Sequence, residues 1–175
     1  MGIFFYILIR FRKWQYGMAA VLTIIHDTLI LLSIFSIFPL FMPFSMEINQ
    51  TFIAALLTVI GYSINDTVVV FDRIREYLGI YKKKDTVGVI NDAINSTLSR
   101  TIITSLTTLI VVLILFIFGG EVIKGFAFAL LIGIIIGTYS SIFIATPLVV
   151  DLDRAADKRT GGVESKKTKT QKAVS

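Results

Sequence analysis

Residues 101–150, TIITSLTTLIVVLILFIFGGEVIKGFAFALLIGIIIGTYSSIFIATPLVV, decide the class of fold. They hold two runs without a charged residue, 101–120 and 125–150, on either side of a short break that contains Glu121 and Lys124. A helix needs about 20 consecutive apolar residues to cross a bilayer, whose hydrocarbon core is roughly 30 Å thick. Because each run reaches that length, the stretch predicts two membrane-spanning helices joined by a short loop.

The same pattern continues toward the N-terminus. Residues 50–71 are interrupted only by Asp66, and residues 17–38 only by His26 and Asp27. Each run is long enough to cross the bilayer as a helix. The sequence therefore predicts an all-α integral membrane protein, a polytopic helical bundle with four complete transmembrane helices plus the end of a fifth.

Shorter segments flank these spans. Residues 1–10 are apolar but too short to cross, and their positive charge follows the apolar run, unlike that of a secretory signal, so we expect the end of a truncated helix. Asp85 is a candidate helix cap that begins an amphipathic lead-in to the third span. We place the transmembrane bundle at residues 1–152 and its complete spans at 17–38, 50–71, 92–119 and 124–150. Residues 153–175 are expected to form a basic, disordered tail.

Composition excludes several classes of function. Hydrophobic residues make up 55% of the 175 residues, more apolar surface than a soluble domain of this size can bury. There is no cysteine and only one histidine, which argues against a thiolate metal site and against a metal-dependent membrane protease. We expect no metal and no cofactor. We also expect no enzymatic activity, because no nucleophile, base and orienting group occur together in a recognisable spacing.

The distribution of the basic residues indicates which loops lie in the cytoplasm. Fifteen of the 17 lysines and arginines precede the first complete span, lie between the second and third, or follow the last. Lys124 is alone in the other loops, and Arg100 is assigned to a helix. The positive-inside rule therefore places the basic loops and the C-terminus in the cytoplasm. The same distribution explains the net charge of +5 without nucleic acid, and a basic tail is attracted to anionic lipid headgroups.

Asp66 is the most conspicuous ionisable residue within a span. A charge at the bilayer centre costs about 2.5 to 3.5 kcal/mol on insertion scales, so such a residue normally faces the bundle interior. Ser63, Asn65 and Thr67 are polar neighbours that would support it. Two interpretations stay open: a site for a proton or another ion, and a polar residue that only holds helices together.

Other ionisable residues within the predicted spans could form a proton pathway together with Asp66. Arg100 lies at a depth that Asp66 shares, with Thr104 on its face, and is predicted either as the counter-charge of Asp66 or as an anchor that reaches the interface. His26 and Asp27 lie near the middle of their span, where they would relay protons or cap a neighbouring backbone. We therefore name Asp66, Arg100, Asp27 and His26 as candidates for a proton pathway.

The last span carries a regular stripe of small residues. It consists of Gly125, Ala129, Gly133, Gly137, Ser141 and Ala145, at every fourth position. Small residues let helices approach closely, which matters in lipid because no hydrophobic drive favours association there. The stripe predicts helix packing within the bundle, with a groove along which helices slide as the alternative.

Four segments carry a resemblance to a known family. They are GYSINDTVVVFDRIRE at 61–76, IHDTLI around His26, NSTLSRTIITSLTTL at 95–109, and GFAFALLIGIIIGTYSSIFIATPL at 125–148. Their order and spacing resemble those of the SecD/SecF family of bacterial protein-export membrane proteins, and within it the C-terminal membrane half of the SecF type. The resemblance covers residues 1–152. It is compatible with a fragment or with the end of a fused SecDF chain.

The resemblance implies a function. SecD/SecF proteins belong to the resistance-nodulation-division superfamily and use the proton-motive force to assist preprotein translocation through SecYEG in the bacterial inner membrane. In the family, the residues matching Asp66 and Arg100 are associated with proton passage, with sodium as an alternative coupling ion. The implied partners are a SecD half, the N-terminal part of SecF, SecYEG with YajC and YidC, the preprotein and membrane lipid.

Two other functions are the alternatives. One is half of another proton-driven exporter of the same superfamily. The other is a membrane scaffold of the translocon that transports nothing. Measurement of proton flux in vesicles distinguishes this scaffold from the transporters.

Overall fold

The computed structural model describes residue 11, residues 14–81 and residues 85–155 of the chain. This part contains helices and no strands, and four of its helices are long and apolar enough to cross a membrane. They are α2 (Trp14–Ile37), α3 (Gln50–Ile80), α4 (Thr86–Phe118) and α5 (Glu121–Ser140), which continues through the π-helical segment η1 (Ser141–Ala145). The predicted all-α membrane bundle is confirmed. The predicted helix end at 1–10 lies outside the described residues.

The helices extend beyond the spans that hydropathy defines. The last one continues through η1 to Ala155, so residues 153–155, assigned to the tail from the sequence, are helical. The reason is local, because Leu, Arg and Ala favour helix and no glycine or proline occurs between Pro147 and Gly161. The remainder of the predicted tail, 156–175, is not among the described residues.

Caps and turns set the helix limits. The side chain of Asn49 accepts hydrogen bonds from the backbone N–H groups of Thr51 and Phe52, at 3.0 and 3.1 Å, and so caps α3. The predicted cap Asp85 accepts from the N–H of Gly88 at 3.2 Å and begins α4. Gly120, with φ of +71°, makes the turn into α5, a conformation that glycine adopts without strain.

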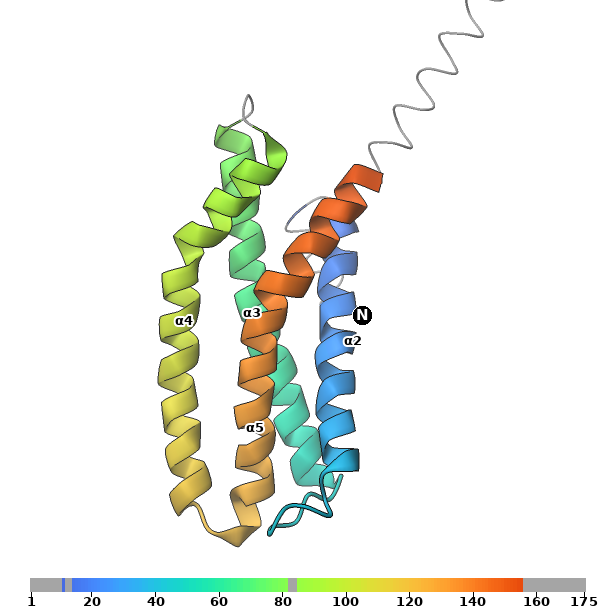
Figure 1. The fold of residues 1–175 in the computed structure, drawn as a ribbon, viewed down its shortest axis with the longest axis vertical. Helices are drawn as coiled ribbons and strands as arrows, with labels where there is room; N and C mark the ends of the chain where they lie inside the picture. Colours follow the sequence, from blue (N-terminus) through green and yellow to red (C-terminus); the bar gives the residue numbers. More distant parts are fainter. Residues whose placement is uncertain (1–10, 12–13, 82–84, 156–175) are drawn as a thin grey trace, which may run out of the picture.

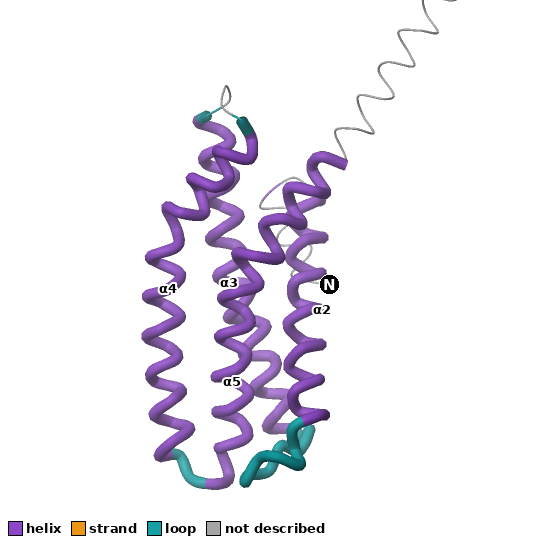
Figure 2. Tube along the Cα trace, viewed as in Figure 1, coloured by secondary structure: helices purple, strands orange, loops and turns teal. Residues whose placement is uncertain are grey.

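The four helices form an elongated antiparallel bundle (Figure 1). Helix α5 packs against α2, α3 and α4, and α2 and α4 lie on opposite sides of it. The connections α2–α3 and α4–α5 lie at one end, at the bottom of Figure 2, whereas α3 ends and α4 begins at the other. This alternation is what four consecutive membrane crossings require.

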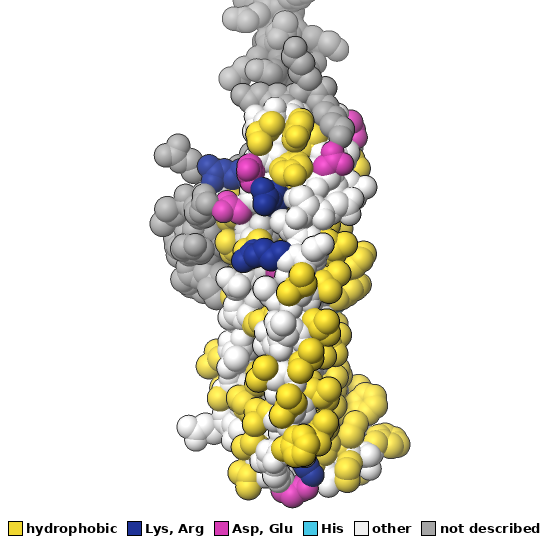
Figure 3. Space-filling view, turned by 90° about the vertical axis from the view of Figure 1, so that its left-hand side faces the viewer, with side chains coloured by type: hydrophobic (Ala, Val, Ile, Leu, Met, Phe, Trp, Pro, Cys, Tyr) yellow, Lys and Arg dark blue, Asp and Glu magenta, His cyan; other side chains and the backbone are white. Residues whose placement is uncertain are grey.

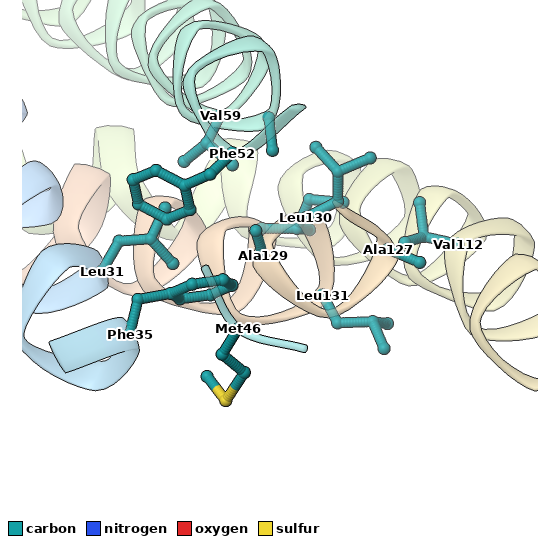
Figure 4. Packing of buried hydrophobic residues seen from close by; sticks show 12 residues of the cluster. Leu31, Phe35, Met46, Phe52, Val59, Val112, Ala127, Ala129, Leu130 and Leu131 are labelled. Atoms are coloured by element: carbon teal, nitrogen blue, oxygen red, sulfur yellow. The ribbon is translucent and has the colours of Figure 1, made fainter. Parts of the chain in front are cut away.

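The apolar core is divided into two clusters. One contains Phe71 and Ile74 and lies toward the end at which α4 begins. The other contains Phe35 and Phe52, whose ring centroids are 4.5 Å apart, and lies toward the α4–α5 turn (Figure 4). Each of the four helices contributes to both clusters. In each helix, the segment between the residues of the two clusters contributes to the candidate functional site.

Candidate functional site

A layer of buried polar side chains separates the two apolar clusters. Every helix contributes to it near the middle of its length. Its members are Thr23, Asp27, Ser63, Asp66, Thr67, Thr97, Thr101, Ser105, Ser140 and Ser141. Because polar groups are costly at the centre of a membrane bundle unless they bond to one another, such a layer marks a candidate functional site.

Asp66 is held in this layer by two hydroxyl groups. The residue is 8% exposed, and its two carboxyl oxygens accept hydrogen bonds from different helices. Thr101 of α4 donates to Oδ1 at 3.1 Å, and Ser141 of η1 donates to Oδ2 at 2.9 Å. Asp66 therefore joins α3 to α4 and to the last helix near the middle of the bundle.

Asp27 forms a second site of the same kind. It is 2% exposed, and its Oδ2 accepts from Ser63 of α3 at 2.7 Å and from Ser140 of α5 at 2.8 Å. Its Oδ1 lies 3.1 Å from Nδ1 of His26, whose side chain is 34% exposed. The adjacent residues thus point in different directions, Asp27 into the bundle and His26 toward its periphery, yet their side chains still touch.

The supporting residues named from the sequence divide into two groups. Ser63 and Thr67 are buried, but Ser63 donates to Asp27 and not to Asp66, on whose helical face it lies. Asn65 and Thr104 are exposed on the outside of the bundle. The Thr104 hydroxyl donates to carbonyl oxygens of its own helix, at 2.9 and 3.0 Å.

Arg100 does not pair with Asp66 in the described part of the chain, so of its two interpretations from the sequence the structure does not support the counter-charge. Its side chain is exposed, because neighbouring residues are about 100° apart around a helix and Thr101 takes the inward position. Arg100 instead lines a polar cavity of about 650 Å³ between α3 and α4, together with Asp72 and Glu76. Figure 3 shows charged side chains gathered on the upper part of this face, above a largely apolar surface.

Three donors were not singled out from the sequence as parts of the site. Thr101 and Ser140 were not named, and Ser141 was named only as a small packing residue. Two features of the sequence could have indicated them: a hydroxyl residue next to Arg100 and a pair of serines within an apolar run. Within the described residues, no three histidine, cysteine or acidic side chains converge as a metal site requires.

The small-residue stripe packs against α3. A Cβ atom on Gly133 would lie 2.6 Å from Cγ1 of Val59, and one on Gly137 would lie 3.0 Å from Cβ of Ser63. Ala129 is fully buried. Gly125 approaches the backbone of Ser45, whose carbonyl oxygen would be 2.7 Å from an added Cβ. These contacts support the packing interpretation of the stripe.

Comparison with known proteins agrees with this architecture. The family model described as "Protein export membrane protein SecD/SecF, C-terminal" matches residues 1–155. The chain belongs to the SecD/SecF family. The resemblance that the motifs at 61–76, 95–109 and 125–148 indicated is therefore confirmed.

Relatives within the SecD/SecF family include protein translocase subunits of the SecF and SecDF types. The protein translocase subunit SecF of Rhodothermus marinus is 63% identical over 158 residues, which cover 90% of this chain and 51% of the relative. The subunit SecDF of Brucella abortus is 49% identical over 150 residues, which cover 86% and 19%. The chain thus spans about half the length of the SecF relative.

Solved SecDF structures share the fold. The crystal structure of SecDF in its super-membrane-facing form matches with a TM-score of 0.80 at 42% identity, over 91% of this chain and 21% of that chain. SecDF from Thermus thermophilus, described as a translocon-associated membrane protein, matches with a TM-score of 0.76 at 44% identity, over 86% and 20%. The four-helix arrangement is therefore that of a SecDF membrane region.

Proposed function

We propose that this chain is the membrane half of a SecF-type subunit that uses the proton-motive force to assist preprotein translocation, with Asp66 as the proton-binding group. The arrangement around Asp66 carries the proposal, because this buried carboxyl accepts hydrogen bonds from the hydroxyls of Thr101 and Ser141. An ionised carboxylate only accepts hydrogen bonds, whereas the protonated acid also donates one. A hydroxyl both donates and accepts, so Thr101 and Ser141 suit either state. The site can therefore gain and lose a proton without exchanging partners.

The remaining candidates take supporting roles in this proposal. His26 and Asp27 form a second part of the pathway, since the half-buried imidazole touches a buried carboxyl. Arg100 lines the cavity that opens beside Asp72 and Glu76, one residue from the Thr101 that donates to Asp66. The coupling ion is a proton in this reading, with sodium as the alternative, and no cofactor is required.

The partners are proposals because the chain spans only about half of its SecF relative. A SecD half is supported by the SecDF relatives and by the exposed polar side chains Asn65 and Arg100 on helices that cross the membrane. Lipid does not satisfy such groups, so another protein surface should cover them. The N-terminal part of SecF, SecYEG with YajC and YidC, and the preprotein complete the proposed assembly in the bacterial inner membrane.

Collapse of the proton gradient tests this function. Vesicles that contain the complete SecD/SecF complex and SecYEG should translocate preprotein more slowly when the gradient is dissipated at constant ATP. Vesicles with SecYEG alone provide the baseline for effects on the channel. If the complete complex gives the same acceleration with and without the gradient, the chain is a scaffold of the translocon and not a proton-driven transporter.

The proposed orientation has a separate test. Because the chain has no cysteine, single cysteines can be introduced without background. Lys83→Cys should be protected from an impermeant thiol reagent in intact cells, whereas Ser45→Cys, in the α2–α3 connection, should react. Labelling of Lys83→Cys from outside would reverse the assigned topology.

A further inference from the structure

The last helix presents two adjacent serines to two different carboxylates. Ser140 is the last residue of α5 and donates to Oδ2 of Asp27 at 2.8 Å. Ser141 is the first residue of η1 and donates to Oδ2 of Asp66 at 2.9 Å. Both serines are fully buried. Two consecutive residues thus supply one hydroxyl donor to each of the two buried carboxyls.

Helix geometry explains how neighbours reach different partners. Successive side chains are about 100° apart around the axis, so one serine faces α2 while the next faces α3. The segment Ser141–Ala145 is π-helical, with wider i→i+5 hydrogen bonding that often occurs at functional sites. The serine pair lies where the α-helical and π-helical registers meet.

Each serine also has a second acceptor on its own helix. The Ser140 hydroxyl lies 3.2 Å from the carbonyl oxygen of Gly137, and that of Ser141 lies 3.0 Å from the carbonyl oxygen of Thr138. These acceptors are adjacent residues of the last α-helical turn. Each hydroxyl can therefore donate either to its carboxylate or to this turn.

A second connection runs along α3. Ser63 donates to the same Asp27 oxygen that accepts from Ser140, at 2.7 Å. Asp66 lies three residues after Ser63, on the same face of α3. The two carboxyl groups are therefore linked through α3 as well as through the serine pair.

We propose that Ser140 and Ser141 are positioning residues that couple Asp27 to Asp66, so that the two carboxyl groups bind protons as one unit. The proposal rests on the proposed function of Asp66. When a proton binds Asp66 at Oδ2, the new O–H donates to the oxygen of Ser141, and the Ser141 hydrogen turns to the carbonyl of Thr138. No other bond forms or breaks. The helical turn that accepts this hydrogen bond also contains the carbonyl oxygen of Gly137, which is the alternative acceptor of Ser140. The change is therefore transmitted to Ser140, and from Ser140 to Asp27.

Few other charges face this unit in the described residues. On α2 the neighbour is His26, 3.1 Å from Asp27. On α4 it is Arg100, which points outward. On α5 and η1 no charged residue or histidine occurs between Lys124 and Asp151. The serine pair is accordingly the part of the last helix that can respond to both carboxyls.

Infrared difference spectroscopy and proton flux test the coupling in the full-length complex reconstituted in vesicles. Asp27→Asn and Asp66→Asn first assign the carboxyl bands. Ser141→Ala should then change the band of Asp27, to which Ser141 donates no hydrogen bond, and Ser140→Ala should change that of Asp66. Each variant should lower proton flux about tenfold, as expected for a lost hydrogen bond to a charged group. The double variant should be no worse than about tenfold, whereas independent effects would multiply to about a hundredfold.

The controls separate the possible outcomes. Ser33→Ala removes an exposed hydroxyl that bonds only to its own helix and should leave bands and flux unchanged. Ser141→Thr keeps the hydroxyl and should retain most of the flux, which a role in packing alone would not predict. If Asp66→Asn stops proton flux but each serine variant alters only the band of the carboxyl it contacts, the coupling is wrong and the proposed function stands. If Asp66→Asn leaves flux intact, the proposed function itself fails.

Discussion

Replacement of Asp66 by asparagine is expected to reduce proton flux and proton-driven translocation to background while the bundle still assembles. Asparagine has nearly the same size, and its amide oxygen accepts from Thr101 as the carboxylate does. Its amide nitrogen donates to Ser141, whose hydroxyl accepts in turn. The change in the free energy of unfolding should therefore stay within about 1 kcal/mol. What disappears is the ability to bind and release a proton.

The measurement compares proton flux and preprotein translocation in vesicles with a full-length SecD/SecF complex at equal protein level. Glu121→Gln is the matched control, because it also exchanges a carboxylate for an amide, but at an exposed ion pair with Lys124, away from the polar layer. Exposed ion pairs contribute about 1 kcal/mol or less, so this control should keep its flux. Wild-type flux in the Asp66→Asn variant would leave the scaffold hypothesis as the better account.

Replacement of Gly133 by alanine should destabilise the bundle, although alanine is the better helix former. An added Cβ would lie 2.6 Å from Cγ1 of Val59 and closer still to Cγ2. Either the Val59 side chain or the α3–α5 distance must then change. Overpacking of this kind costs about 1 to 3 kcal/mol. We expect a lower melting temperature in detergent.

Two further variants test the cause of this loss. Gly61→Ala adds the same methyl group on α3 where no atom beyond the adjoining residues and backbone of its own helix lies within 4 Å, and should be neutral or stabilising by up to about 1 kcal/mol. Val59→Ala combined with Gly133→Ala should recover part of the lost stability, because the two side chains compete for one space. An unchanged melting temperature for Gly133→Ala would contradict the close packing of α5 on α3.

Much of this protein could be predicted from its sequence because the solvent of its helices is lipid. Each charge-free run has to be a helix, in which the backbone hydrogen bonds are formed within the segment. The four spans could therefore be identified from the sequence. For the same reason, a carboxylate inside such a run stands out, as Asp66 and Asp27 do. The stripe that contains Gly133 was visible because close helix contact requires small residues at a four-residue spacing.

The pairing of these groups was decided by the tertiary structure. A sequence gives each residue an angle around its own helix but not the identity of the helix that faces it. Ser63 and Asp66 share a face of α3, yet Ser63 donates to Asp27 on another helix. Arg100 was the obvious counter-charge for Asp66, but a neighbouring threonine occupies the inward position.

By itself, then, the sequence determined that residues 17–150 contain four helices long enough to span a membrane and that two of them carry carboxyls within the span. Only the tertiary structure decided that these carboxyls bond to hydroxyls, and that Ser140 and Ser141 serve one carboxyl each. The physical reason is that the angle of a residue around its own helix follows from 3.6 residues per turn, whereas the helix that faces it depends on how all four helices pack. That packing is not encoded in any single helix.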